Sequence, residues 1–298
     1  MKLVTYQING QPQLGALQGN QVIDLRLAYR AMQHDAKAPF PEDMITLLME
    51  GQTGLDRVAA IIEFVEAGSP GLFRRLDDIV LLPPVLQPGK VVALGRNYAA
   101  HAKEGGSEPP QYPMLFHKTA GALLGAGGTI VIPPITTKVD YEGELAIIIG
   151  KTCKQVSAEE ALDYVAGYTI ANDVSARDLQ RRTTQFTAGK MLDTFGPLGP
   201  ALVTRDEVPD PGNLRIITRL NGEVMQDGHT RNMIFSVPFT ISYISQIATL
   251  HVGDVIMTGT PEGVGFARTP PVFLKKDDVV EVEIEKLGTL TNPVQNQR

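Results

Sequence analysis

Three acidic residues, spaced two positions apart, lie at the start of one of the most apolar segments of the chain. Asp140, Glu142 and Glu144 would share one face of a β-strand, because successive side chains of a strand point to opposite sides. Apolar residues follow on both faces as far as Ile149, which is typical of a buried strand. Neighbouring carboxylates at the mouth of such a strand repel one another and resist desolvation unless a cation lies between them. The spacing therefore predicts a cation site, with a solvated acidic strand end as the alternative.

A third acid that suits this site, Asp173, follows the apolar segment Tyr168–Ala171 and precedes a predicted helix. Such positions commonly carry ligands, although an ordinary acid at a helix entrance explains Asp173 equally well. Carboxylates without cysteine or histidine favour an oxygen-preferring ion, Mg²⁺ or Mn²⁺, over zinc. Three ligands, Glu142, Glu144 and Asp173, would leave coordination positions open for water and a bidentate substrate.

Two further segments contain groups suited to acid–base and electrostatic catalysis. His101 and Glu104 are three residues apart, so one helical turn would place them side by side. The carboxylate would orient the imidazole as a general base for water; an ordinary surface pair is the alternative. Lys190 lies in a segment rich in Gly and Pro, where its ammonium would compensate a substrate carboxylate or a developing oxyanion. The alternative for Lys190 is a solvated surface lysine.

Strands are expected to position most of these residues. Asn221-Gly222 predicts a hairpin turn, because both residues tolerate positive φ. Two helix starts are predicted from a serine followed three residues later by an acid, beginning at Ser157 and at Ser175. The predicted strands are Val91–Leu94, Glu144–Ile149, Tyr168–Ala171, Leu214–Leu220, Val255–Met257 and Val279–Ile284.

The N-terminal segment has a different pattern from the rest. Residues 1–32 alternate short apolar runs with turn sequences, which predicts small strands and hairpins. Apolar residues recur at helical spacing in residues 43–67, with a break at 51–54. Prolines between residues 81 and 89 disfavour helix and strand interiors. We therefore predict an α+β, mostly β protein with a small N-terminal α+β domain, residues 1–84, and a larger β-rich domain, residues 85–298.

Composition excludes several classes of function. Hydrophobic residues make up 43% and charged residues 20% of the 298 residues, as in ordinary globular proteins. The net charge of −6, without basic blocks and without Trp, argues against binding nucleic acid or an anionic membrane. Cys153 is the single cysteine, so an intrachain disulfide is impossible. The polar N-terminus and the short apolar runs predict no signal peptide and no membrane span, and we expect a cytoplasmic protein.

Taken together, the motifs resemble the fumarylacetoacetate hydrolase family over roughly residues 85–294. Each motif alone is unspecific, but their combined order and spacing are specific. The N-terminal segment resembles the small leading domain of some bacterial members. The segments that carry the resemblance are Gly95–Tyr98 with His101 and Glu104, Asp140–Leu145, Asn172–Gln180, Asp193–Pro200 and Thr258–Gly265.

The resemblance implies a catalytic domain of the mixed β-roll type, usually in a homodimer. It implies Mg²⁺ or Mn²⁺ on the three carboxylates named above, and water activated by His101 and Glu104 with assistance from Lys190. Family members contact the 2-oxo acid end of the substrate at the positions of Arg177, Gln180 and Thr260. Further candidates for the same pocket are Arg96, Tyr98 and Lys118.

The resemblance also restricts the chemistry. Larger family members carry a fourth metal carboxylate upstream of the histidine, which Leu94-Gly95-Arg96 does not offer, so the chain resembles the smaller branch. That branch implies reaction of a small 2-oxo acid through a metal-stabilised enolate. Hydrolysis of an acylpyruvate such as fumarylpyruvate and decarboxylation of oxaloacetate are both open. Alternatives are isomerisation of a 2-hydroxyhepta-2,4-diene-1,7-dioate, hydrolysis of a diketo sugar acid, and a non-enzymatic protein with a structural ion.

Overall fold

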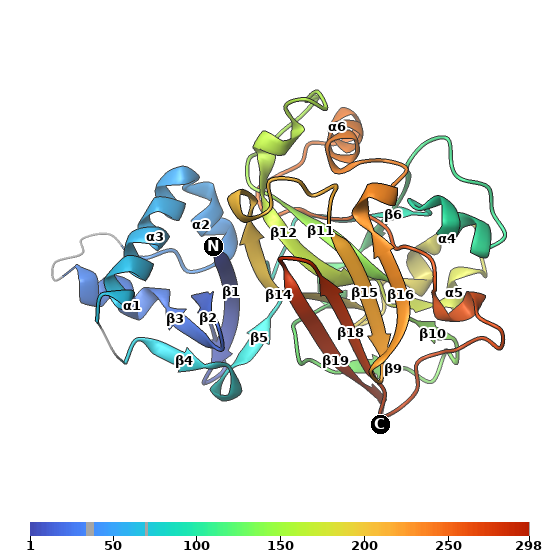
Figure 1. Ribbon diagram of the computed structural model, residues 1–298, viewed down its shortest axis with the longest axis horizontal. Helices are drawn as coiled ribbons and strands as arrows, with labels where there is room; N and C mark the ends of the chain where they lie inside the picture. Colours follow the sequence, from blue (N-terminus) through green and yellow to red (C-terminus); the bar gives the residue numbers. More distant parts are fainter. Residues whose placement is uncertain (34–38, 69–70, 298) are drawn as a thin grey trace.

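The computed structural model describes residues 1–33, 39–68 and 71–297. Strand residues outnumber helix residues in it, which confirms the predicted α+β, mostly β fold class (Figure 1). A smaller N-terminal part, blue in Figure 1, stands beside a larger β-rich part. Within the described residues, none of the helices combines the length and the apolar character that crossing a membrane requires.

Short antiparallel strands and three helices form the N-terminal part. Asn9 and Gly10 adopt positive φ values of 50° and 78° and turn the chain between its first two strands. The predicted interruption of the helical segment occurs at Gly51, whose φ is 60°. The elements are β1 (Lys2–Ile8), β2 (Gln11–Gln18), β3 (Gln21–Asp24), α1 (Leu25–Met32), α2 (Met44–Met49), α3 (Gln52–Glu66), β4 (Phe73–Arg75) and β5 (Val80–Leu82).

One sheet extends through both parts of the molecule. Its strand order is β4-β3-β2-β1-β14-β12-β11-β17-β6-β7, with β5 beside β1 and β8 beside β14. β1 pairs antiparallel with β14, with Lys2 opposite Val203 and Leu3 opposite Leu202. The division at residues 84 and 85 stays a prediction. The remaining strands are β6 (Val91–Gly95), β7 (Met114–Lys118), β8 (Leu123–Leu124), β11 (Gly143–Ile149), β12 (Val165–Asn172), β14 (Gly196–Thr204) and β17 (Val255–Met257).

The strand that follows the acidic residues, β11, is buried on both faces, as predicted. Leu145 and Ile147 pack into one hydrophobic core, whereas Ala146 and Ile148 pack into another. Alternating side chains of a central strand produce this division. β11 lies between β12 and β17, so its backbone is hydrogen-bonded on both sides. Side chains at its start are therefore held on a rigid support.

A second sheet, with strand order β16-β15-β18-β19-β9, lies in front of the first in Figure 1. Ile216 and Val282 of this sheet share the core that contains Leu145. The predicted hairpin is present, with φ values of 53° at Asn221 and 83° at Gly222. The elements are β9 (Ile130–Ile132), β15 (Arg215–Leu220), β16 (Glu223–His229), β18 (Val279–Ile284) and β19 (Gly288–Asn296), with β10 (Val139–Asp140) paired to β13 (Ser175–Ala176), and the helices α4 (Ala99–Glu104), α5 (Arg177–Gln180) and α6 (Val237–Ile247).

The prediction of a helix that starts at Ser157 is wrong. The Ser157 hydroxyl donates to Glu160 Oε2 at 3.1 Å and accepts from the Glu160 backbone N–H at 3.3 Å, so the capping interaction forms. Only a 3₁₀ turn, Ala161–Tyr164, follows. The Tyr164 carbonyl accepts the Gly150 N–H at 2.7 Å, and the next residue already belongs to β12, so a helix cannot continue.

The second helix also begins later than predicted. Ser175 belongs to β13, and α5 starts only at Arg177. The Asp178 carboxylate accepts the Thr136 hydroxyl instead of reaching back to Ser175. A short strand pairing with β10 therefore takes the place of the first helical turn.

Candidate active site

Three buried carboxylates, Glu142, Glu144 and Asp173, offer oxygen atoms that all lie within 4.8 Å of one another. The β11–β12 pairing brings them together, because Gly143 lies opposite Asn172. The Asp173 N–H donates to the Glu142 carbonyl at 2.8 Å and fixes the turn that follows β12. Burial of three acids at one point requires a compensating positive charge.

The donor set fits a hard divalent ion. All its ligand atoms are carboxylate oxygens, which Mg²⁺, Mn²⁺ and similar ions prefer. Glu144 is oriented by the Gly259 N–H, which donates to its Oε2 at 2.8 Å. These residues can therefore hold a metal ion in their buried position.

Asp140 lies outside this cluster, although it was expected on the same strand face. The chain leaves β-structure at Tyr141 and Glu142, so β10 and β11 are separate strands. The Asp140 carboxylate accepts hydrogen bonds from Arg177 Nε at 2.9 Å and from the backbone N–H of Gly265 at 2.8 Å. Its role in the structure is to hold Arg177 in place.

Three buried cations neutralise part of the acidic charge. Lys190 Nζ lies 2.7 Å from Glu142 Oε2 and 2.5 Å from Asp173 Oδ2. Lys118 Nζ lies 2.6 Å from Asp173 Oδ1. Arg177 Nη2 lies 2.7 Å from Glu142 Oε1. Lys190 is thus a fully buried ammonium rather than an exposed loop lysine, and its role toward a substrate carboxylate or oxyanion stays a prediction.

These charges shift the pKa values of Glu142 and Glu144 in opposite directions. Burial raises the pKa of Glu142, but the positive charges of Arg177 and Lys190 outweigh burial and hold this pKa well below its usual range. Burial also raises the pKa of Glu144, and here the negative charges of Asp173 and Glu142 add to it, so the pKa is well above its usual range. A cation at the cluster would therefore replace a proton on Glu144.

His101 and Glu104 form the predicted pair on α4. His101 Nδ1 and Glu104 Oε1 are 2.8 Å apart. Glu104 Oε2 accepts the Gly263 N–H at 2.8 Å, which fixes the carboxylate against the loop that follows Thr260. Across the described residues, His101 Nε2 has no hydrogen-bond partner, so this nitrogen is the one available to a bound molecule.

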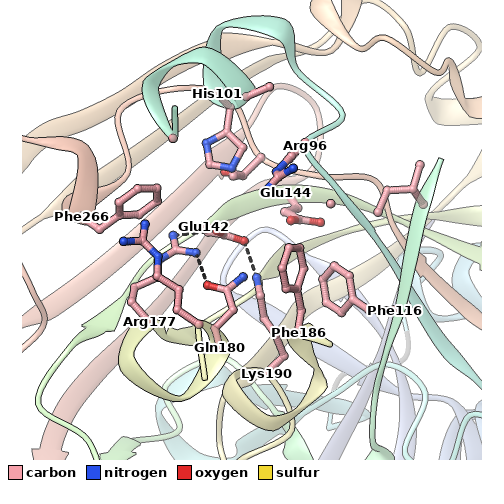
Figure 2. A pocket seen from close by; sticks show the side chains of 16 residues that line it. Arg96, His101, Phe116, Glu142, Glu144, Arg177, Gln180, Phe186, Lys190 and Phe266 are labelled. Carbon is pink, nitrogen blue, oxygen red and sulfur yellow. Dashed lines mark hydrogen bonds and ion pairs between the residues drawn. The ribbon is translucent and has the colours of Figure 1, made fainter. Parts of the chain in front are cut away.

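A cavity of about 190 Å³ joins the pair and the carboxylates. His101 lies above Glu142 and Glu144 in Figure 2, with Lys190 below them. Several candidates that the sequence indicated line this cavity: Arg96, His101, Glu142, Glu144, Arg177, Gln180, Lys190 and Thr260. Four others stand behind the lining: Tyr98, Glu104, Lys118 and Asp173.

Two of the predicted substrate contacts already have protein partners. Gln180 Oε1 accepts Arg177 Nη1 at 3.1 Å. The Thr260 hydroxyl donates to the Gly143 carbonyl at 2.9 Å and accepts from Gln226 Nε2 at 2.8 Å. These contacts fix the side chains at the cavity wall.

Residues that the sequence analysis did not select complete the cavity. Phe116, Phe186 and Phe266 provide apolar walls, and Arg181 lies at the same cavity. The ring centroid of Phe116 is also 5.0 Å from Lys190 Nζ. The aromatic residues lie outside acidic or basic patterns, and their placement depends on contacts between distant segments, so no local signal identified them.

The sequence and fold have clear relatives. The family model "Fumarylacetoacetate (FAA) hydrolase C-terminal" matches residues 90–295. A Bos taurus protein, oxaloacetate tautomerase FAHD2A, mitochondrial, is 44% identical across 99% of this chain and 91% of its own length. The chain belongs to the fumarylacetoacetate hydrolase family.

Solved structures agree with this assignment. Fumarylacetoacetate hydrolase from psychrophilic Exiguobacterium antarcticum superposes with a TM-score of 0.82 at 36% identity, with full coverage of both chains. Maleylpyruvate hydrolase from Sphingobium sp. SYK-6, solved with manganese(II) ion and pyruvate, gives a TM-score of 0.78 at 31% identity, also with full coverage of both chains.

Proposed function

We propose that this protein is a divalent-metal-dependent enzyme that interconverts the keto and enol forms of oxaloacetate. The observation that carries the proposal is the cluster of three buried carboxylates beside an imidazole whose Nε2 faces no protein partner among the described residues. Keto–enol conversion moves one proton between C3 and the 2-oxo oxygen. Its enolate is the species shared by the reactions expected from the sequence. The relative named oxaloacetate tautomerase supports oxaloacetate as the substrate.

The proposed metal ligands are Glu142, Glu144 and Asp173, with Mg²⁺ or Mn²⁺ as the ion. The manganese(II) in the Sphingobium structure supports an ion of this kind. When bound, the ion would supply Lewis acidity for the oxygens of a 2-oxo carboxylate. The buried ammonium and guanidinium groups that pair with Glu142 and Asp173 offset part of the repulsion among the three acids.

The proton transfer is assigned to the helix α4 pair. His101 Nε2 takes the proton from C3 and delivers it to the 2-oxo oxygen to give the enol, and the reverse transfer restores the keto form, while Glu104 holds Nδ1 in its protonated form and stabilises the imidazolium. Lys190 presents its ammonium to the oxygen that becomes negative in the enolate. Both groups line the same cavity, as the transfer requires.

The remaining predicted residues have positioning roles in this proposal. Arg177, Gln180 and Thr260 shape the wall that contacts the 2-oxo acid end. Lys118 does not line the cavity, but it holds Asp173 in place through a fully buried ion pair. Tyr98 is buried at the residue that directly precedes α4, and its packing supports the helix that carries His101.

Hydrolysis of an acylpyruvate is a second candidate, because a histidine–glutamate pair beside a cavity is also suited to activating water. The likeness to maleylpyruvate hydrolase supports this candidate. Decarboxylation of oxaloacetate needs the same enolate but no water, so it depends less on His101.

The test follows the enol of oxaloacetate by its ultraviolet absorbance, with enzyme and Mn²⁺ or Mg²⁺, with enzyme and EDTA, and with metal alone. Pyruvate formation and acylpyruvate loss are measured in parallel. Metal-dependent enol–keto conversion without pyruvate formation supports tautomerisation. If pyruvate forms faster than the enol is converted, the reaction is decarboxylation instead. If an acylpyruvate is lost faster than the enol is converted, the reaction is hydrolysis instead. His101→Ala should abolish tautomerisation, whereas His117→Ala, at an exposed histidine on β7 outside the cavity, should leave the rate unchanged.

We further propose that the protein acts as a cytoplasmic homodimer. The family resemblance supports the dimer, while the Bos taurus relative is named as mitochondrial. Sedimentation velocity of the purified chain tests the dimer directly.

A further inference from the structure

Two guanidinium groups at the cavity have no acidic partner. Arg96 and Arg181 both line it. In the part of the chain that the structure describes, neither side chain forms an ion pair or a side-chain hydrogen bond. Each instead lies over an aromatic ring of the cavity, Arg96 at 5.9 Å from the centroid of Phe186 and Arg181 at 4.5 Å from that of Phe266. Their charge is available to a bound molecule.

The inner cations differ from these two. Lys118, Lys190 and Arg177 are buried, and each is within 2.7 Å of a carboxylate at the base of the cavity. These contacts pair the three cations with Glu142 and Asp173, two of the proposed metal ligands. A second negative group on the substrate would therefore have to be bound elsewhere.

Counting charges leads to the same conclusion. With a divalent ion in place of the proton on Glu144, the base of the cavity would contain four carboxylates, of Asp140 and the three acids of the cluster, and the three inner cations. A divalent ion would leave this base with one positive charge, which the 2-oxo carboxylate of the substrate neutralises. Arg96 and Arg181 then give the outer cavity two positive charges, of which the distal carboxylate of a dicarboxylate neutralises one and a monocarboxylate neutralises none.

The positions of the two arginines suit a clamp. Figure 2 shows Phe266 to the left of Glu142 and Arg96 to the right of it, and Arg181 is 4.5 Å from the ring centroid of Phe266, so the two arginines lie toward opposite sides of the cavity. Arg96 has a φ of 57° and is followed by Asn97, whose side chain bonds the Phe235 and Thr258 carbonyls and fixes the turn. Arg181 is exposed and follows the last residue of α5.

We propose that Arg181, facing Arg96 across the cavity, binds the distal carboxylate of the substrate and makes the enzyme selective for 2-oxo dicarboxylates. This inference rests on the proposed function for the reaction, but it concerns binding of the end of the substrate that does not react. A guanidinium suits this role because its planar donors match a carboxylate in a bidentate manner.

The experiment compares oxaloacetate with its 4-methyl ester, which lacks the distal charge. Arg181→Met should raise KM for oxaloacetate about tenfold, as expected for loss of one charge-assisted contact, with kcat changed less than twofold. KM for the ester should not change. Arg181→Lys should recover part of the loss, because the charge remains. The matched control is Arg182→Met, at an adjacent exposed arginine that does not line the cavity.

Binding gives a second readout that is independent of turnover. Calorimetry with the Mn²⁺-loaded protein should show tighter binding of 2-oxoglutarate than of 2-oxopentanoate, and Arg181→Met should remove that preference. No preference in the wild type, or an equal loss for both acids in the variant, overturns the clamp. Absence of turnover together with a preference that depends on Arg181 would refute the proposed reaction and support the clamp.

Discussion

Replacing Lys190 by methionine tests how the acidic cluster is balanced. Lys190 is fully buried and contacts both Glu142 and Asp173. Methionine keeps much of the side-chain volume but removes the charge, which leaves two buried carboxylates without their nearest cation. Breaking a buried ion pair in this way costs about 3–5 kcal/mol. We expect this full cost in the metal-free protein.

A bound divalent ion should reduce the cost, because it supplies positive charge to the same carboxylates. With about 2 °C of Tm per kcal/mol for a chain of this size, Lys190→Met should lower Tm by about 6–10 °C in EDTA. In saturating Mn²⁺ the loss should be at most about half as large. Differential scanning calorimetry of wild type and variant under both conditions measures the two shifts.

Lys90→Met is the matched control. Lys90 Nζ lies 2.8 Å from Asp254, a fully buried carboxylate away from the cavity, so its loss should lower Tm equally with EDTA and with Mn²⁺. If Lys190→Met behaves like this control, or causes no shift in EDTA, Lys190 does not balance the metal-binding acids and the reasoning fails.

The other predictions concern the cluster and its support. Because burial and then Asp173 raise the pKa of Glu144, the contribution of this group to metal-free stability should be fully present below the ordinary carboxyl pKa and be lost as pH rises through the raised value, which thermal unfolding as a function of pH measures. For the same reason Mn²⁺ binding should release protons, measured by calorimetry in buffers of different ionisation heat; no release at any pH contradicts the assignment. Glu142→Ala should abolish both Mn²⁺ binding and turnover, and retention of tight binding would remove Glu142 from the ligand set. Gly259→Ala should weaken Mn²⁺ binding and lower stability by about 1–3 kcal/mol, because φ is 94° and the added Cβ would lie 2.8 Å from another side chain. Gly222→Ala, with φ of 83° and open space around it, should lower stability without changing Mn²⁺ affinity.

The elements that were predictable from sequence are those whose local pattern and tertiary environment agree. β11 has apolar residues on both faces and lies between two cores, so periodicity and packing favour the same structure. Ser157 shows the opposite case. Its capping interaction forms, but the Tyr164 carbonyl bonds to Gly150 and the chain enters β12. That contact is distant in sequence, and it outweighs the local preference.

The candidate site was likewise predictable only where short local motifs mark its residues. The short motifs identified Glu142, Glu144 and Asp173, which the β11–β12 register then brings together. Nothing in the local sequence indicates that the Gly259 N–H orients Glu144 or that Arg181 lies over Phe266. Such contacts join segments far apart in the chain, and only the folded arrangement defines them.

The pairing of β1 with β14 affects which parts of the chain can be separated. β12 occupies one edge of β14, and on the other edge β1 covers residues near Val203 while β8 covers those near Gly196. A fragment that begins at residue 85 would leave the β1-binding stretch of β14 as an unprotected sheet edge, which favours self-association over a monodisperse solution. The N-terminal segment thus protects the sheet edge of the part that carries the cavity, and a minimal catalytic fragment would need a substitute strand or charged gatekeeper residues on β14.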